Sequence, residues 1–355
     1  MREDILVEVK DEIIYEKYTE KYKNQVIDLL RFLWKDRSED MRKMLFEWKY
    51  EQNPYFPNTM FIALLNNRVV GFRGYLIVPS ILNNKEFYTI RLADGVVDPI
   101  ARRQGIFREL NRFSLNYLFN DSRFKGVLTL TSNKDSTPVY LKLGWKKLVN
   151  KAPLFRISIL GVIKRYLFKN LKFNESEINC DGLTYKISES LNFDTTHLDK
   201  LASGNIKKNK VCTLKKSDWY SWRFKNPNKN YVYATCWRNE ELMGFILLDN
   251  SKKYCSIVDY LFIDKSTLKS LLAVTLRELK PAITMQWTVT KNQELLNIFR
   301  RNGFCSFDFL VKDKVRPVLI ATPQLDQEKY SWSYDGLDLS EEKSWDLNLI
   351  DSDAS

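Results

Sequence analysis

Histidine and closely spaced cysteine are what this chain of 355 residues most lacks. It contains one histidine, His197, and five cysteines without a CxxC pair, at positions 180, 212, 236, 255 and 305. A zinc site needs clustered cysteine and histidine ligands, and a disulfide framework needs an even number of cysteines. The sequence therefore excludes both kinds of site, no metal is expected, and the cysteines are predicted to be reduced and buried. A single histidine, in a predicted inter-domain segment, also argues against an imidazole base.

Long apolar runs are missing as well. No stretch approaches the roughly 20 apolar residues that span a bilayer, and the N-terminal MREDILVEVKDE has no apolar signal core. We therefore expect a cytoplasmic protein. With 44% apolar residues the chain can bury a sizeable core. Because single cores stop growing at roughly 250 to 300 residues, its length predicts two domains.

The common glycine-rich phosphate loops are absent too. There is no GxxxxGK[ST] and no GxGxxG after a strand, so nucleoside triphosphate and dinucleotide binding lack support. The formal net charge is nevertheless +12, and because residues 335–355 hold seven acidic side chains against one lysine, the preceding residues carry +18. That balance favours a phosphate-rich partner. On charge alone, a nucleotide cofactor, a nucleic acid and an anionic membrane surface remain open.

What the chain does contain is an internal repeat, found in two blocks. The first block pairs Trp48, Asn53–Pro54 and Gly71–Phe72 with Trp222, Asn226–Pro227 and Gly244–Phe245. The second block pairs Asn133, Tyr140, Gly144 and Trp145 with Asn292, Phe299, Gly303 and Phe304, at identical offsets. Two blocks in the same order indicate a tandem duplication.

Each copy is predicted to have the same elements: strand, helix, strand meander, loop and helix, strand, and a short helix. In the first copy, Asn66 and Asn67 supply a hairpin turn. The run IFRELNRFSLNYLFN (106–120) has helical apolar spacing, and a short helix after it is ended by Gly144. The expected class is α/β (mixed α+β), with two domains that are each a mostly antiparallel mixed sheet flanked by helices.

The stretch VVDPIARRQGIFREL (96–110) joins a strand to a helix through a basic loop. Pro99 ends the strand because it lacks an amide donor, and Gly105 permits a backbone conformation that a side chain would block. The free amides and dipole of the following helix form an anion site, to which turn amides add. Arg102, Arg103 and Arg108 add positive charge. A pyrophosphate would fit this loop.

This stretch, followed by SNKDSTPVYLKLGW, resembles the GNAT superfamily of acetyl-CoA-dependent N-acetyltransferases over residues 13–150. The family pattern is [QR]xxGx[GA] after a bulged strand, and then Asn-x6-Tyr-x3-Gly-[Phe/Trp]. The positions that match are Arg102, Gly105, Asn133, Tyr140, Gly144 and Trp145. Phe107 departs from the pattern because it stands where glycine or alanine is usual.

The resemblance implies a geometry for acetyl-CoA. Val96 and Val97, on a splayed strand, would bind the pantetheine and the acetyl carbonyl, Asn133 would touch the pantetheine arm, and Tyr140 would stand beside the sulfur as general acid. The pyrophosphate would be held by Arg102 and by the loop amides of Arg103, Gln104, Gly105, Ile106, Phe107 and Arg108. Asp94 is the first candidate for the base; Asp98, Glu47 and a water chain are the alternatives.

The predicted division of the chain follows from the repeat. Residues 1–150 are predicted to form the catalytic domain. Residues 176–314 are predicted to be a degenerate copy that lacks the glycine, the arginine pair and the tyrosine, and that completes the acceptor cleft. Residues 151–175 are a connector, for which strand and linker, or a basic amphipathic helix touching a membrane, are both open. Residues 315–355 form an acidic aromatic tail that either folds back onto the basic body or is disordered.

The predicted function is N-acetylation of a small-molecule amine by direct attack on acetyl-CoA. The resemblance points to a nucleotide- or lipid-linked amino sugar of bacterial surface polysaccharide synthesis, while peptide and antibiotic amines stay open. The alternatives are an aminoacyl-tRNA-dependent transferase of the FemX type and a non-catalytic protein that binds CoA or another ligand. No nucleic-acid partner is expected, and peripheral membrane contact is a minor hypothesis.

Overall fold

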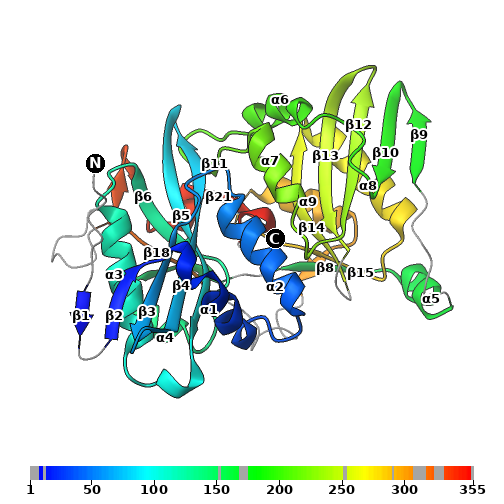
Figure 1. The fold of residues 1–355 in the computed structure, drawn as a ribbon. Coiled ribbons are helices and arrows are strands. Elements are labelled where there is room, and N and C mark those ends of the chain that lie inside the picture. Colours follow the sequence, from blue (N-terminus) through cyan, green and yellow to red (C-terminus); the bar gives the residue numbers. More distant parts are fainter. Residues whose placement is uncertain are drawn as a thin grey trace.

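The computed structural model describes residues 8–10, 13–150, 153–167, 175–250, 254–289, 292–306, 317–323 and 332–352. Two large sheets lie side by side, the first on the left of Figure 1 and the second on the right. Each sheet has helices on both faces, so the predicted class and architecture are confirmed.

The first sheet is built mostly from the N-terminal part of the chain. Its strands, in spatial order, are β1 (Glu8–Lys10), β2 (Ile13–Lys17), β3 (Met60–Leu65), β4 (Arg68–Leu82), β5 (Lys85–Val97), β6 (Phe124–Thr129), β18 (Pro317–Ala321) and β7 (Lys146–Asn150). Neighbours are antiparallel except for β5 and β6, which are parallel. One face carries α1 (Lys23–Leu29), α2 (Glu39–Phe46) and the turn Glu47–Glu51, and the other carries α3 (Ile106–Phe119) and α4 (Thr137–Lys142).

The second sheet repeats this plan. Its order is β17 (Cys305–Ser306), β8 (Leu154–Ile157), β15 (Ile283–Gln286), β14 (Cys255–Phe262), β13 (Glu241–Asp249), β12 (Tyr231–Arg238), β10 (Leu183–Ser188) and β9 (Ser176–Cys180). Here β14 and β15 are the parallel pair. Its helices are α6 (Thr196–Gly204), α7 (Ser217–Phe224), α8 (Lys265–Leu279) and α9 (Gln293–Arg301).

The two halves exchange one strand each. β18 follows the second sheet in the chain but lies in the first, between β6 and β7. β8 follows the first sheet in the chain but lies in the second, between β15 and β17. Residues 151–175, predicted to be a connector, thus supply a strand to the second sheet, and residues 315–355, predicted to be a tail, supply one to the first.

Both sheets contain the same bulge. In the first, Arg73 pairs with Gly95 and Tyr75 with Leu92, so β5 has one more residue than β4 between the two pairs. In the second sheet, Ile246 pairs with Tyr260 and Leu248 with Ile257, with the same excess on β14. This register makes Arg73 equivalent to Ile246, Gly95 to Tyr260, and Asp94 to Asp259.

The interface between the halves is built from the repeated tryptophans. The Trp48 and Trp222 rings stack with their centroids 5.2 Å apart. Each indole Nε1 donates a hydrogen bond of 2.8 Å to the backbone oxygen of the other tryptophan. Reciprocal contacts of this kind are typical of a twofold interface between two copies of one unit.

The C-terminal segment folds back between the halves, as one of the two sequence hypotheses held. β11 (Val211–Thr213) pairs with both β4 and β21 (Trp345–Asn348), which β16 (Thr288–Val289) also joins. Trp345, Leu347 and Ile350 are fully buried. The Arg223 guanidinium donates to the backbone oxygens of Ile350 and Ser352.

α5 (Ile159–Leu167) stands at the edge of the molecule (Figure 1) and exposes apolar side chains. The exposed residues are Ile159, Leu160, Val162 and Ile163. The 154–173 stretch therefore contains both a sheet strand and a helix; residues 168–173 lie outside the described residues. Of the helices that the structure describes, none has the length and apolar character needed to cross a membrane.

All five cysteines are free, but the prediction that they are buried is wrong for two of them. Cys180 and Cys305 are exposed, because each lies on a strand at an outer edge of the second sheet. Burial raises the pKa of the Cys212 and Cys236 thiols to about 11 and that of Cys255 to about 12.

Candidate active site

The end of β5 separates from its parallel neighbour. β5 pairs with β6 from Tyr88 to Arg91 and then continues to Val97. On its other side it stays paired with β4 as far as Val97. Within the described part of the chain, the β6-facing edge of residues 92–97 therefore has no neighbouring strand. Val96 is buried on this segment, and the Val97 carbonyl accepts a hydrogen bond of 3.1 Å from Arg102 Nε.

The loop after β5 is fixed by Asp98. Its Oδ1 accepts from the Ile100 amide at 3.0 Å, which caps the turn Pro99–Ala101, and its Oδ2 pairs with Arg68 at 2.8 Å. Both carboxylate oxygens are thus engaged. This geometry gives Asp98 a structural role at the end of the strand.

The helix α3 begins with free amides. Arg103 and Gly105 both have left-handed backbone conformations, with φ of 67° and 80°. The amides of Arg108 and Glu109 donate to the Gly105 oxygen. Among the described residues, the amides of 103–107 donate to no protein acceptor, as expected at the first turn of a helix. The loop therefore presents consecutive donors suited to a phosphate group.

Side chains around this loop are mostly in solvent. Arg102, Arg103, Gln104 and Arg108 are exposed, and Ile106 is buried. Arg108 Nε is 2.9 Å from Glu109 Oε1. Phe107, the residue that departs from the motif, is half-buried, and its ring lies 5.9 Å from that of Tyr140. The departure is accommodated by packing, and the helix still starts at residue 106.

The second half closes the equivalent anion site. There α8 is capped by Asp264, whose Oδ1 accepts from the Thr267 amide at 2.8 Å. The Asp264 carboxylate thus binds an amide in the first turn of α8, whereas Gly105, the N-cap of α3, has no side chain to do so. A phosphate would be repelled by that carboxylate.

Tyr140 lies on α4 and is buried. The centroid of its ring lies 4.9 Å from that of Trp145, and the Trp145 amide donates a hydrogen bond of 3.1 Å to the backbone oxygen of Tyr140. The same contacts recur between Phe299 and Phe304. The two copies therefore differ here by a phenol oxygen.

Asn133 begins the turn that precedes α4. Its Oδ1 accepts from the amides of Asp135 and Ser136, both at 2.9 Å. Asn292, its counterpart, caps α9 by accepting from the Leu295 amide. The pantetheine contact of Asn133 stays a prediction, and the structure shows only that its oxygen holds this turn.

Asp94 sits at the bulge of β5, and both of its oxygens are bonded. Oδ2 accepts from Lys49 Nζ at 3.0 Å and from the Tyr50 hydroxyl at 2.7 Å, and Oδ1 accepts from Trp34 Nε1 at 3.2 Å. These partners, Lys49, Tyr50 and Trp34, were not predicted from the sequence, although the first two lie in the repeated Trp block. Glu47, an alternative base, pairs with Lys23 at 3.3 Å.

The second half has a similar network built from other positions of the repeat, because alignment of Trp48 with Trp222 makes Arg223 and Phe224 the counterparts of Lys49 and Tyr50. Asp259 accepts from Lys215 Nζ at 2.7 Å, from the Tyr220 hydroxyl at 2.8 Å and from Asn348 at 3.0 Å. Each bulge thus holds an aspartate bound to a lysine and a tyrosine. The bulge aspartate is therefore present also in the half without the glycine loop and the phenol, from which we infer a structural role for Asp94.

A cleft of about 550 Å³ opens on the α2 side of β5, between the two halves. Trp34, Lys49 and Asp94 line it from the first half, and residues 226–230 line it from the second. Exposed Lys35 and Arg37 stand at its wall. Tyr140 and Phe107 pack on the opposite face of the sheet, in the cluster that contains α3. Residues 92–97 of β5, which lie beyond its pairing with β6 and are called its free end below, therefore lie between the cleft and Tyr140.

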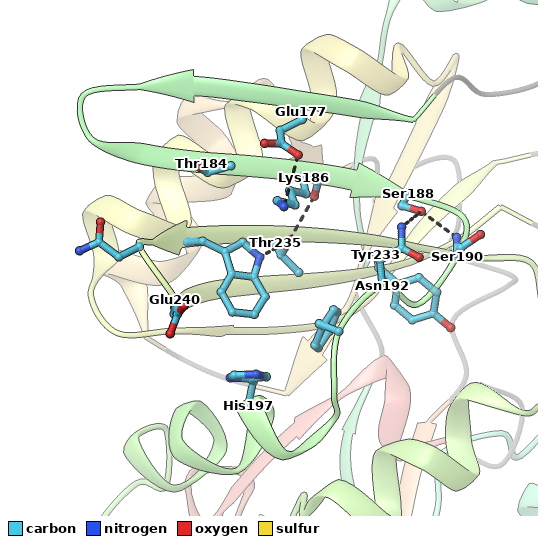
Figure 2. A pocket seen from close by; sticks show the side chains of 13 residues that line it. Glu177, Thr184, Lys186, Ser188, Ser190, Asn192, His197, Tyr233, Thr235 and Glu240 are labelled. Atoms are coloured by element: carbon cyan, nitrogen blue, oxygen red, sulfur yellow. Dashed lines mark hydrogen bonds and ion pairs between the residues drawn. The ribbon is translucent and has the colours of Figure 1, made fainter.

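A second hollow, of about 480 Å³, lies on the second sheet over β9, β10 and β12 (Figure 2). Its polar side chains bond one another: Trp237 Nε1 donates to Thr235 at 2.9 Å, and Lys186 pairs with Glu177 at 3.3 Å. His197 stands exposed beside the Trp237 ring. No cluster of metal-ligating side chains occurs here or elsewhere in the described ranges.

Comparisons with known proteins concern the family and the fold. Residues 17–145 match the acetyltransferase (GNAT) family. A search among curated proteins gives no match. A solved structure of a probable N-acyltransferase from Enterococcus faecalis superposes with a TM-score of 0.62 at 10% identity, over 88% of this chain and 73% of its own.

Two further structures share the fold. A GCN5-related N-acetyltransferase from Anabaena variabilis gives a TM-score of 0.61 at 8% identity, over 88% of this chain and 73% of its own. A tandem GNAT protein from the clavulanic acid biosynthesis pathway gives 0.50 at 12% identity, over 88% of this chain and 99% of its own. At such identities the likeness establishes the fold alone.

Proposed function

Residues 17–145 of this chain belong to the acetyltransferase (GNAT) family, and from that premise we propose that the protein transfers an acetyl group from acetyl-CoA to an amine of a small molecule. The observation that carries the proposal is the combination of a β5 edge without a neighbouring strand and a following helix that begins with free amides. An extended pantetheine chain adds to such an edge as a strand would, and a pyrophosphate suits the helix start. The second half has lost the anion loop.

The residues present fit this ligand. The amides of 103–107 and the side chains of Arg102 and Arg103 would hold the phosphates, and the backbone at Val96 and Val97 would align the arm. The acceptor amine would enter from the cleft and attack the acetyl carbon directly. Holding both reactants in line supplies much of the rate. Tyr140 would donate a proton to the departing sulfur.

The acceptor is proposed to be an amino sugar linked to a nucleotide or a lipid, of the kind used in bacterial surface polysaccharide synthesis. What supports this class is the pair of exposed cations, Lys35 and Arg37, beside the aromatic wall of the cleft, since guanidinium and ammonium groups bind phosphate. The test is release of free CoA from acetyl-CoA in the presence of nucleotide-linked amino sugars. Salt-sensitive tRNA binding without CoA binding would instead favour the aminoacyl-tRNA-dependent alternative.

Gly105→Ala is expected to weaken acetyl-CoA binding about tenfold, because residue 105 has φ of 80° and alanine resists that conformation at a cost of about 1–2 kcal/mol. Isothermal calorimetry with acetyl-CoA measures the change. Gly182→Ala is the matched control, because Gly182 also has a positive φ and no atom near its Cβ position, but it lies in the β9–β10 hairpin. Equal affinity in both variants would contradict a role for the loop.

Tyr140→Phe is expected to lower kcat by about 30–100-fold, with the KM for acetyl-CoA unchanged, since general acids contribute about this much or more. Phenylalanine fits this environment, because Phe299 occupies the equivalent position with the same backbone contact. Steady-state kinetics with saturating acceptor measure kcat. Full turnover by the variant would remove Tyr140 from the mechanism.

A further inference from the structure

Arg73 is a buried cation without a counter-ion. It lies on β4 with 2% of its surface exposed, and its Nε and Nη2 atoms are buried without a hydrogen-bond partner. In the part of the chain that the structure describes, no carboxylate forms an ion pair with it. An unpaired buried charge costs several kcal/mol, so a protein that keeps one sacrifices stability.

The position of this charge is specific. Arg73 pairs with Gly95 across the sheet, and its Nη1 lies 2.4 Å from where a Cβ at residue 95 would stand. Glycine at residue 95 therefore leaves the space that the guanidinium occupies. The guanidinium also lies 5.1 Å from the centroid of the Tyr75 ring and 5.8 Å from that of Tyr140. The cation thus sits between the free end of β5 and the tyrosine proposed as general acid.

The second half shows that the fold does not need this charge. By register, Ile246 stands in place of Arg73 and Tyr260 in place of Gly95. Ile246, Tyr260 and Phe299 are all buried there, and the Tyr260 and Phe299 rings pack 5.5 Å apart. In the second sheet, which has the equivalent bulge, apolar and aromatic side chains therefore fill the space that the guanidinium occupies in the first. Arginine, glycine and the tyrosine on α4 are present together in one half and replaced together in the other.

We propose that Arg73 stabilises the negative charge that develops on the CoA sulfur when the thioester is cleaved. This inference rests on the proposed function. The acceptor nitrogen forms a bond to the acyl carbon and the carbon–sulfur bond breaks, its electron pair leaving on sulfur as a thiolate beside Arg73. The amine proton passes to water, and Tyr140 then protonates the thiolate and regains its own proton from water. The ionisable groups that act on Arg73 are the phenols of Tyr50, Tyr75 and Tyr140, and among the described residues no carboxylate neutralises the guanidinium. A thiolate would supply the missing counter-charge.

The test compares CoA with desulfo-CoA, which lacks the thiol, by calorimetry at pH 8. The wild-type chain is expected to bind CoA at least tenfold more tightly than desulfo-CoA, because the guanidinium favours the thiolate. Arg73→Met is expected to bind both with equal affinity, and Arg73→Lys to keep part of the preference. In steady-state kinetics, the Arg73→Met variant is expected to have a kcat about 100-fold lower than the wild type, with little change in the KM for acetyl-CoA.

Stability separates this role from a structural one. Removal of an unpaired buried cation is expected to leave the melting temperature of Arg73→Met unchanged or raised, whereas loss of a structural residue would lower it. Gly95→Ala, which would displace the guanidinium, should lose the same preference for CoA. Equal binding of CoA and desulfo-CoA by the wild-type chain, or a retained preference in Arg73→Met, would overturn the inference. Absence of binding of either ligand by the wild-type chain would overturn the proposed function, and the inference with it.

Discussion

A chain that ends after residue 314, where the sequence alone places the end of the second domain, is expected to lose the cooperative folding of its N-terminal half. The truncation removes β18, whose residues Val318, Leu319 and Ile320 are fully buried between β6 and β7. It also removes the buried side chains Trp345, Leu347 and Ile350. Each such side chain contributes about 2 kcal/mol, so their sum matches the roughly 5–15 kcal/mol by which a domain is stable.

Urea unfolding followed by circular dichroism, and hydrogen exchange of the amides in β6 and β7, measure this effect. A chain that ends after residue 352 is the control, since it keeps every buried residue of the segment, and it should unfold at the midpoint of the full chain. A peptide of residues 315–355 added to the truncated chain should restore part of the protection in β6 and β7. An unchanged unfolding midpoint after truncation would contradict the strand exchange.

The repeat, and with it most of the fold, could be predicted because its signals are local. The hairpin at Asn66 and Asn67 forms as expected, with both residues at positive φ. The predicted helix at 106–120 is α3, with Gly105 as its cap. The exchanged strands could not be predicted. PVLIA and LFRI are short apolar runs, and nothing within four or five residues says to which sheet they pair.

The candidate site was predicted unevenly for a related reason. The loop at Gly105 and the tyrosine at 140 follow from motif spacing, which is local in the sequence. Lys49 and Tyr50, which follow α2, are about 45 residues from Asp94, and Trp34, which precedes α2, is 60 residues away, so this network is visible only in three dimensions. Arg73 lies in a strand, where a charged side chain usually faces solvent, so its burial could be learned only from the structure.

The duplication itself separates scaffold from chemistry. Features kept in both halves hold the structure: the tryptophan pair, the asparagines at the turns that begin α4 and α9, and the aspartates at the two bulges. Features present in one half are the open helix start, the phenol and the buried guanidinium. We therefore propose that the second half serves as an inactive reference within the same chain, and on that basis we expect Asp94 to be a structural residue.

Asp94→Asn is accordingly expected to lower the free energy of unfolding by about 3–5 kcal/mol, because it leaves the buried Lys49 ammonium without its carboxylate. Asp259→Asn, which does the same to Lys215, is the matched control in the other half and should cost a similar amount. Urea denaturation at neutral pH compares the two. A loss below about 1 kcal/mol for Asp94→Asn, the range of a solvated surface pair, would contradict the structural role.

The double variant Asp94→Leu with Lys49→Met separates a structural aspartate from a catalytic base. Replacing both members of a buried ion pair with apolar groups is often neutral for stability, so the double variant should regain most of what Asp94→Asn loses. If Asp94 only holds the bulge, turnover returns with stability to within about tenfold of the wild type. If Asp94 is the base, turnover stays lower by about 10²–10⁴-fold although the protein is stable again. Because Asp259 also binds a lysine and a tyrosine, in a half without the glycine loop and the phenol, we expect the first result.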